Sequence, residues 1–132
     1  MEVIEKNELA TAFYDAVNKI IVFKTTSILA NKNIDKIESL LKKALSMTKK
    51  NAVVGEIVDL THLRGNFNNI IHFLTKEYYP SMAELGMKKA AYVLSNDFLS
   101  NTLVRKIMNE TQTVEVQSFG SLESAKKWVI KP

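Results

Sequence analysis

The feature that most constrains the fold of this 132-residue chain is one apolar run, Ala52–Leu60, which reads Ala-Val-Val-Gly-Glu-Ile-Val-Asp-Leu. A strand that is apolar at nearly every position is typical of a parallel sheet covered on both faces. Before this run, apolar residues at helical spacing predict a helix that begins near Asn31 or Asn33 and ends at Asn51. The alternating segment Lys19–Thr25 predicts a strand ahead of that helix. Strand, helix and strand in this order imply a right-handed crossover between parallel strands.

The rest of the chain divides at turn and capping residues. Leu9–Tyr14 alternates and is joined to Lys19–Thr25 by a turn-forming segment, which predicts an antiparallel hairpin. Helical spacing resumes over 70–78, and Pro80 predicts a kink or two consecutive helices. The last predicted elements are a strand over Lys89–Ser95, a helix capped by Asn96 or Asp97, a strand over Thr111–Phe119 and a helix capped by Ser121.

In chain order these elements read ββαβαβαβα. They predict one α/β domain over residues 1–132, with a mixed, mainly parallel five-stranded sheet flanked by four or five helices. A chain of this length buries about two-thirds of its unfolded surface, so its core can form without disulfides or a structural metal. The absence of Cys excludes disulfides, a thiol nucleophile and a zinc site with thiolate ligands.

The net charge of +4 does not predict a nucleic-acid partner. Only Arg64 and Arg105 are arginines among the 18 cations, and the lysine pairs fall near helix ends or on polar faces. The aromatic residues fall at strand or core positions rather than beside the basic ones. No apolar run reaches the roughly 18 to 20 residues of a membrane span, and no export signal is present. We therefore expect a cytoplasmic protein with no membrane span.

Polar residues follow each predicted parallel strand, and the carboxyl ends of such strands are where open α/β folds place ligands. This rim would collect Thr25, Thr26 and Ser27, the loop after Leu60, and Ser95 to Asp97. Helix capping and turn formation use the same residue types and explain most of these positions. The candidate binding residues on the longest of these loops are Asp59, Thr61, His62, Arg64, Asn66, Phe67, Asn68 and Asn69.

Catalysis finds little support in the sequence. Asp59, His62 and Arg64 could form an acid, a base and an anion clamp on one loop. However, the chain has no nucleophile elbow, no glycine-rich phosphate loop and no cluster of carboxylates. The second histidine, His72, lies between apolar residues and is better explained as a core or surface side chain than as a ligand. We therefore expect no enzyme activity, no cofactor and no metal site.

Two features interrupt the expected core. Apolar and aromatic residues surround the break at Pro80, and a groove there would be lined by Phe73, Tyr78 and Met82. The other feature is Glu56, a carboxyl group inside an otherwise apolar strand, which needs a polar partner, a pocket or a sheet edge. Arg64 and nearby lysines are candidate partners for it.

Three stretches resemble the STAS-like or SpoIIAA-like superfamily, especially its small stand-alone bacterial members. They are the strand ending in Ile57-Val58-Asp59-Leu60, the segment from Tyr79-Pro80 to Val93, and the close Phe119-Gly120-Ser121-Leu122-Glu123 followed by Trp128-Val129. The resemblance covers the chain from about Leu9 onward. It implies a SpoIIAA-like fold and a binding role, because the best-known members are regulators that bind other proteins.

The resemblance does not extend to the regulatory serine of that superfamily. The matching position falls on Phe67-Asn68-Asn69-Ile70, which has no hydroxyl group. Thr61 is a candidate for the phosphorylated residue only at a position displaced from that motif. We therefore expect a non-enzymatic regulatory or protein-interaction domain without the phosphorylation switch. The alternative is a domain that binds a small apolar or anionic molecule. A homodimer through a helix face or the edge of the sheet stays an open alternative.

Overall fold

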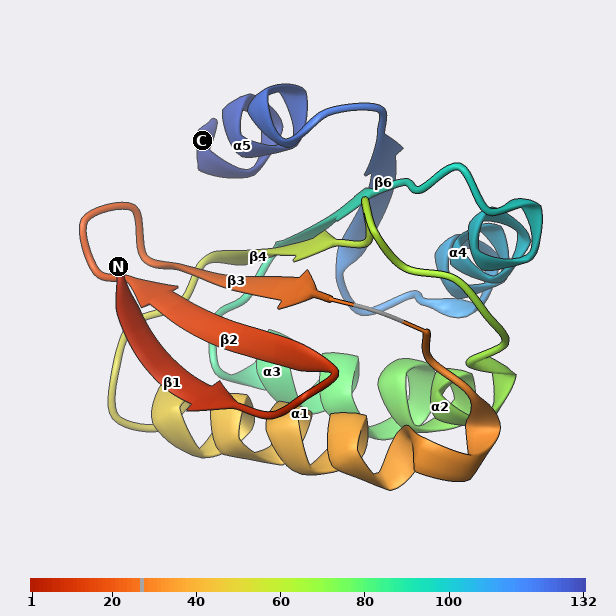
Figure 1. Ribbon diagram of the computed structural model, residues 1–132. Coiled ribbons are helices and arrows are strands. Elements are labelled where there is room, and N and C mark those ends of the chain that lie inside the picture. The colour runs from red at the N-terminus through yellow and green to blue at the C-terminus, as the bar shows by residue number, and fades with distance from the viewer. Residues whose placement is uncertain (27) are drawn as a thin grey trace.

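The computed structural model describes residues 1–26 and 28–132, and it has a single mixed sheet at its centre (Figure 1). The strands of this part of the chain lie in the order β1-β2-β3-β4-β5-β6. Strand β2 is antiparallel to both β1 and β3, whereas β3, β4, β5 and β6 run parallel to one another. Their bounds are Glu2–Lys6, Ala10–Asp15, Ile20–Thr25, Gly55–Asp59, Lys89–Val93 and Glu115–Phe119.

Helices cover both faces of the sheet. Helix α5 lies on one face, and α1, α2 and α3 lie on the other (Figure 1). The helical bounds are Asn31–Asn33 for the short 3-10 turn η1, Ile34–Thr48 for α1, Asn68–Phe73 for α2, Leu74–Tyr78 for the π-helical segment η2, Tyr79–Glu84 for α3, Phe98–Glu110 for α4 and Leu122–Ile130 for α5. The prediction of an α/β chain with a mainly parallel sheet is therefore confirmed.

The prediction of five strands is wrong, because β1 precedes the predicted hairpin and adds a sixth strand to the described sheet. Strand β1 carries the charges of Glu2, Glu5 and Lys6, and a bulge between Val3 and Glu5 interrupts its alternation. The sequence pattern therefore hides this strand. Pairing with β2, rather than its own hydrophobicity, keeps it at the edge of the sheet.

The chain around Pro80 stays helical instead of breaking. Helix α2 continues directly into the π-helical segment η2 and then into α3, with Pro80 in the first turn of α3. Proline is tolerated at the start of a helix because its missing N–H would have no partner there. Gly86, at φ +109°, follows the end of α3, where glycine commonly terminates a helix.

Two apolar cores result from this arrangement. The larger core lies between the sheet and helices α1, α2, α3 and α4, and the smaller lies under α5. Gly55 sets the spacing of the smaller one. A Cβ atom at this position would lie 2.7 Å from Val129 Cγ1 and 3.2 Å from the Lys89 carbonyl oxygen. The glycine therefore lets α5 pack closely on β4.

A second glycine, Gly65, holds the loop after β4 against the segment after β3. Its φ angle is +123°, and a Cβ atom there would lie 2.1 Å from the carbonyl oxygen of Leu29. The Leu29 amide also donates a 2.9 Å hydrogen bond to the Arg64 carbonyl oxygen. Only glycine combines this backbone angle with this close approach.

We predict that Gly65→Ala lowers the free energy of unfolding by at least about 2 kcal/mol, because the new methyl group adds a steric clash to a strained backbone. Gly120→Ala is the matched control, since nothing lies within 4 Å of a Cβ atom at Gly120. Urea denaturation of both variants measures the difference. Equal stability of the two variants would contradict this account of the loop.

Candidate functional site

The carboxyl ends of β4 and β5 border a polar hollow of about 330 Å³. Such an edge of a parallel sheet is the usual position of a binding site in open α/β folds. The hollow draws its walls from the two loops that follow these strands, as the sequence predicted for the rim. Its lining residues are Thr61, His62, Leu63, Arg64, Ser95, Asn96 and Asp97.

Most of the candidate residues on the first loop are exposed. This holds for Thr61, His62, Arg64, Asn66, Asn68 and Asn69, whereas Asp59 is half-buried. The hydroxyl of Thr25, at the end of β3, donates a 3.1 Å hydrogen bond to the Asp59 carbonyl oxygen. The Thr26 hydroxyl donates to the carbonyl oxygens of Glu8 and Leu9. Ser27 lies outside the described residues.

Asp59 does not orient His62 for catalysis. Its Oδ1 atom accepts a 3.0 Å hydrogen bond from the Thr61 amide and another from the Thr61 hydroxyl. This is the local turn that Asp residues commonly form with the backbone two positions ahead. Within residues 1–26 and 28–132, no hydrogen bond to the His62 ring is found. The carboxylate therefore stabilises the loop rather than a catalytic base.

Asp97 connects the two loops of the rim. Its side chain accepts hydrogen bonds from the Gly65 amide at 3.1 Å, the Ser100 amide at 3.2 Å and the Ser100 hydroxyl at 2.7 Å. Hydrogen bonds from Ser100 and then from Gly65 hold the pKa of Asp97 below its usual value. Asp97 is thus the N-cap of α4, as predicted, and also an anchor for the loop after β4.

The remaining asparagines are also held in place. The Asn69 amide donates to Asn31 Oδ1 at 3.0 Å, and the Asn66 side chain accepts from the Asn68 amide at the same distance. Lys106 of α4 donates to Asn68 Oδ1 at 3.0 Å. The loop, η1 and α4 therefore form one connected surface.

Phe67 is a core residue and does not contribute to the exposed rim. It is 3% exposed and belongs to the larger core. The helical spacing of the following residues did not reveal this, because Phe67 precedes α2 as its N-cap and points inward. The prediction that Phe67 is one of the binding residues of the rim is therefore wrong.

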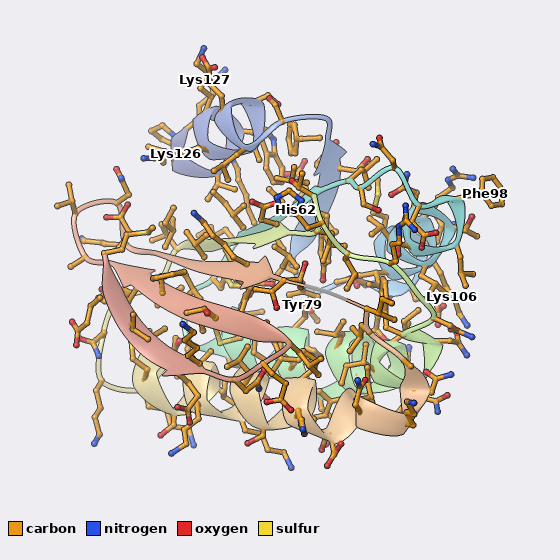
Figure 2. All side chains as sticks on the ribbon, in the orientation of Figure 1. His62, Tyr79, Phe98, Lys106, Lys126 and Lys127 are labelled. Carbon is orange, nitrogen blue, oxygen red and sulfur yellow. The ribbon has the colours of Figure 1, made fainter. Side chains whose placement is uncertain are left out.

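The exposed aromatic residue of this region is Phe98, which the sequence analysis missed. Phe98 is 82% exposed at the first position of α4, directly after Asp97. Figure 2 shows its ring pointing away from the body of the protein. The buried face of α4 consists of Ser100, Leu103, Val104 and Ile107. Phe98 lies outside this buried stripe in the helical pattern, and this position was the sequence signal that could have predicted its exposure.

Further apolar and basic groups lie near Phe98. Leu99 is 42% exposed, and Ile28, which forms an isolated parallel bridge with Arg64, is 65% exposed. Arg105 and Lys106 are exposed seven and eight positions after Phe98. Because seven residues make nearly two full helical turns, Arg105 points in about the same direction as Phe98, and Lys106 lies beside this face. Figure 2 shows Lys106 on the same side of the protein as Phe98.

Glu56 is fully buried under the sheet and is bound by tyrosines, not by Arg64 or lysines. Tyr78 donates to its Oε1 atom at 2.8 Å and Tyr79 to its Oε2 atom at 2.6 Å. The Tyr79 hydroxyl also contacts that of Tyr92. Because the Tyr79 hydroxyl uses its one hydrogen in the bond to Glu56, the Tyr92 hydroxyl is the donor in this second contact.

No cation compensates the Glu56 charge among these contacts. Burial raises the pKa of Glu56 to about 7, although the hydrogen bonds from Tyr79 and Tyr78 oppose this shift. Burial, and then the neighbouring carboxylate, also raises the pKa of Tyr78 and of Tyr79. Burial and then Glu56 raise the pKa of Tyr92 as well, so all three tyrosines are neutral hydrogen-bond donors at physiological pH.

A small pocket of about 60 Å³ lies beside this cluster, between the sheet, α1 and α2. Its walls are almost entirely apolar, and Glu56 and Tyr92 belong to them. A water molecule needs about 10 to 15 Å³ on this measure, so the space matches a few waters or one very small apolar molecule.

The predicted groove at Phe73, Tyr78 and Met82 is not formed. Tyr78 and Met82 are fully buried, and Phe73 is half-buried with Lys42 above its ring. The continuous helix through Pro80 leaves no gap there, so these residues pack into the core instead.

We predict that Glu56 makes the protein less stable as the pH rises from 4.5 to about 7. In this interval the folded state keeps a proton that the unfolded chain has lost, so the unfolded chain binds fewer protons and unfolding becomes easier. The expected loss is about 3 kcal/mol relative to Glu56→Gln, which cannot ionise. Urea denaturation of both proteins across this interval measures it. Parallel stability profiles of the two proteins would rule out this role of the carboxyl group.

Comparison with known proteins shows the fold class. One solved structure that matches is an uncharacterized protein of the DUF3478 family with a SpoIIAA-like fold, from Shewanella loihica PV-4. The TM-score is 0.60 and the sequence identity is 17%, and the match covers 95% of this chain and 98% of that one. No family model and no curated protein matches the sequence. The chain thus has a SpoIIAA-like α/β fold, as the resemblance implied.

Two properties of residues 1–26 and 28–132 concern membranes and metal ions. None of the helices there combines the length and the hydrophobicity that crossing a bilayer requires. In the same residues, no three His, Asp or Glu side chains are grouped so that they could hold a metal ion.

Proposed function

We propose that this chain is a non-enzymatic, cytoplasmic protein-interaction domain that binds its partner at the rim surface, defined as His62, Arg64, Phe98 and Lys106. The observation that carries this proposal is the exposure of Phe98 beside the polar hollow. A solvent-exposed phenylalanine on a helix loses stabilising burial, and aromatic residues are enriched in protein interfaces. The neighbouring Leu99 is also partly exposed, and the exposed Ile28 pairs with Arg64 on the loop after β4.

The charge of the rim surface specifies the partner chemistry. Arg64, Arg105 and Lys106 are exposed, whereas the two nearby carboxylates, Asp59 and Asp97, are occupied by local hydrogen bonds. An acidic segment with an apolar anchor would complement this arrangement. The hollow next to Arg64 offers hydroxyl and amide groups for polar contacts at the rim of such an interface.

Rigidity also favours protein binding at this surface. The Gly65 amide donates to Asp97, and the Arg64 carbonyl oxygen accepts from the Leu29 amide, so two other segments hold the loop in place. A surface that is already ordered loses less entropy on binding than a flexible loop does. The absence of a hydroxyl at Phe67–Ile70 means that any regulation would differ from the phosphorylation switch of the superfamily.

Small-molecule binding in the interior is the weaker alternative. The pocket beside Glu56 measures about 60 Å³, whereas pockets for drug-sized ligands measure about 300 to 1,000 Å³. Catalysis at the rim is also disfavoured, because Asp59 bonds Thr61 instead of His62.

To test the proposal, a photo-crosslinking phenylalanine analogue replaces Phe98 in the protein expressed in its native host. The same analogue at Val17 is the matched control, because Val17 is 90% exposed in the turn between β2 and β3, at the opposite end of the sheet. We expect one specific crosslinked protein at position 98 and none at position 17. Crosslinking at neither position, or equally at both, would contradict the proposal.

The captured protein is then purified, and its affinity is measured by isothermal titration calorimetry. We predict that Phe98→Ala weakens binding about tenfold or more, as truncating a central aromatic anchor usually does. Lys106→Glu should slow association and reduce its salt dependence, whereas Lys126→Glu on α5 should not. Figure 2 shows these two lysines on different helices far apart in the fold. Unchanged affinity of Phe98→Ala would exclude the rim surface as the interface.

A further inference from the structure

The two edges of the sheet differ in how open they are to another strand. Strand β1 carries three charged residues and a bulge, features by which proteins commonly protect an edge from pairing. Strand β6, at the other edge, pairs with β5 in an uninterrupted register from Glu115 to Phe119. Its only charged residue is Glu115, and it has no proline. The β6 edge is therefore the unprotected one.

The hydrogen bonds to β5 reveal which backbone groups of β6 face outward. The Glu115 amide donates to the Lys88 carbonyl oxygen at 3.0 Å, and the Phe119 carbonyl oxygen accepts from the Leu94 amide at 2.9 Å. Along a strand, successive residues direct their N–H and C=O groups to alternate sides. Gln117 therefore also faces β5, and the groups of Val116 and Ser118 point away from the sheet.

We propose that β6 pairs with β6 of a second copy of this chain, antiparallel and centred on Gln117, to form one continuous sheet across a twofold homodimer. In this register, Val116 lies opposite the Ser118 of the other copy. Residues that face each other with outward N–H and C=O groups exchange two hydrogen bonds. The twofold axis repeats the exchange, so all outward groups of Val116 and Ser118 find partners.

The side chains fit the same register. Gln117 lies opposite its own copy, and its exposed amide group can both donate and accept. Val116 lies opposite Ser118, and Glu115 opposite Phe119, so no like charges meet. A twofold interface requires a surface that is complementary to itself, and β6 meets this condition. The proposed pairing uses the edge of β6, and none of the four residues that define the rim surface belongs to this strand.

The absence of cysteine from the chain allows a direct test with Gln117→Cys. Opposite residues that do not exchange hydrogen bonds have Cα atoms about 4.5 Å apart, which lies within the range for a disulfide. Mild oxidation of the full chain should therefore give a disulfide-linked dimer on non-reducing gels. The matched control is Gln112→Cys, an exposed position in the loop before β6, which should stay largely unlinked.

Charge variants test the twofold register in solution. Gln117→Lys places two cations opposite each other, and Gln117→Glu places two anions there, so each variant alone should have the monomer mass by light scattering coupled to gel filtration. An equal mixture of the two should regain the dimer mass, because only the mixed pair is oppositely charged. Circular dichroism checks that both variants fold.

Each main outcome decides the proposal. A dimer that is lost in both single variants and regained in their mixture supports it. A wild-type chain with the monomer mass at every concentration tested would overturn it. A dimer that persists in Gln117→Lys would overturn it equally, because the interface would then lie elsewhere.

Discussion

The constraint on which the rest of the structure depends is the burial of β4 on both faces. Gly55, Glu56 and Ile57 are all buried, so helices must cover the sheet on either side of this strand. The close approach of α5 over Gly55 closes one face, and α1 to α3 close the other. Parallel neighbours then direct the carboxyl ends of the strands to one edge. The position of the rim surface follows from this arrangement.

The same burial explains the Glu56 cluster. A carboxyl group on the covered strand has no access to solvent, and Tyr78, Tyr79 and Tyr92 supply the hydrogen bonds that replace water. Two of these tyrosines come from the continuous helical stretch through Pro80, and the third comes from β5. The cluster therefore connects the sheet to the helical layer through polar contacts inside an apolar core. Both carboxyl oxygens of Glu56 accept hydrogen bonds from tyrosines, so these contacts favour the ionised form, whereas burial favours the neutral one.

Much of the candidate site was predictable because its residues follow local rules. Asp97 and Ser121 cap helices as their positions predicted, and the polar loop after Leu60 does border the hollow. Phe67 and Phe98 were less predictable. Both stand at helix starts, where side-chain direction depends on how the helix docks rather than on sequence spacing. Docking buries the ring of Phe67 and exposes that of Phe98. The exposed aromatic residue of this region is therefore Phe98, whereas the sequence had pointed to Phe67.

By itself, the sequence determined the α/β class, the parallel crossover and the exclusion of cysteine chemistry, since these depend on apolar periodicity and composition. Only the tertiary structure decided that β1 joins the sheet, that Glu56 is held by tyrosines, and that β6 leaves an unprotected edge. The physical reason is the same in each case. Strand pairing and side-chain partners at long sequence separation depend on three-dimensional packing, which local patterns of residues do not encode.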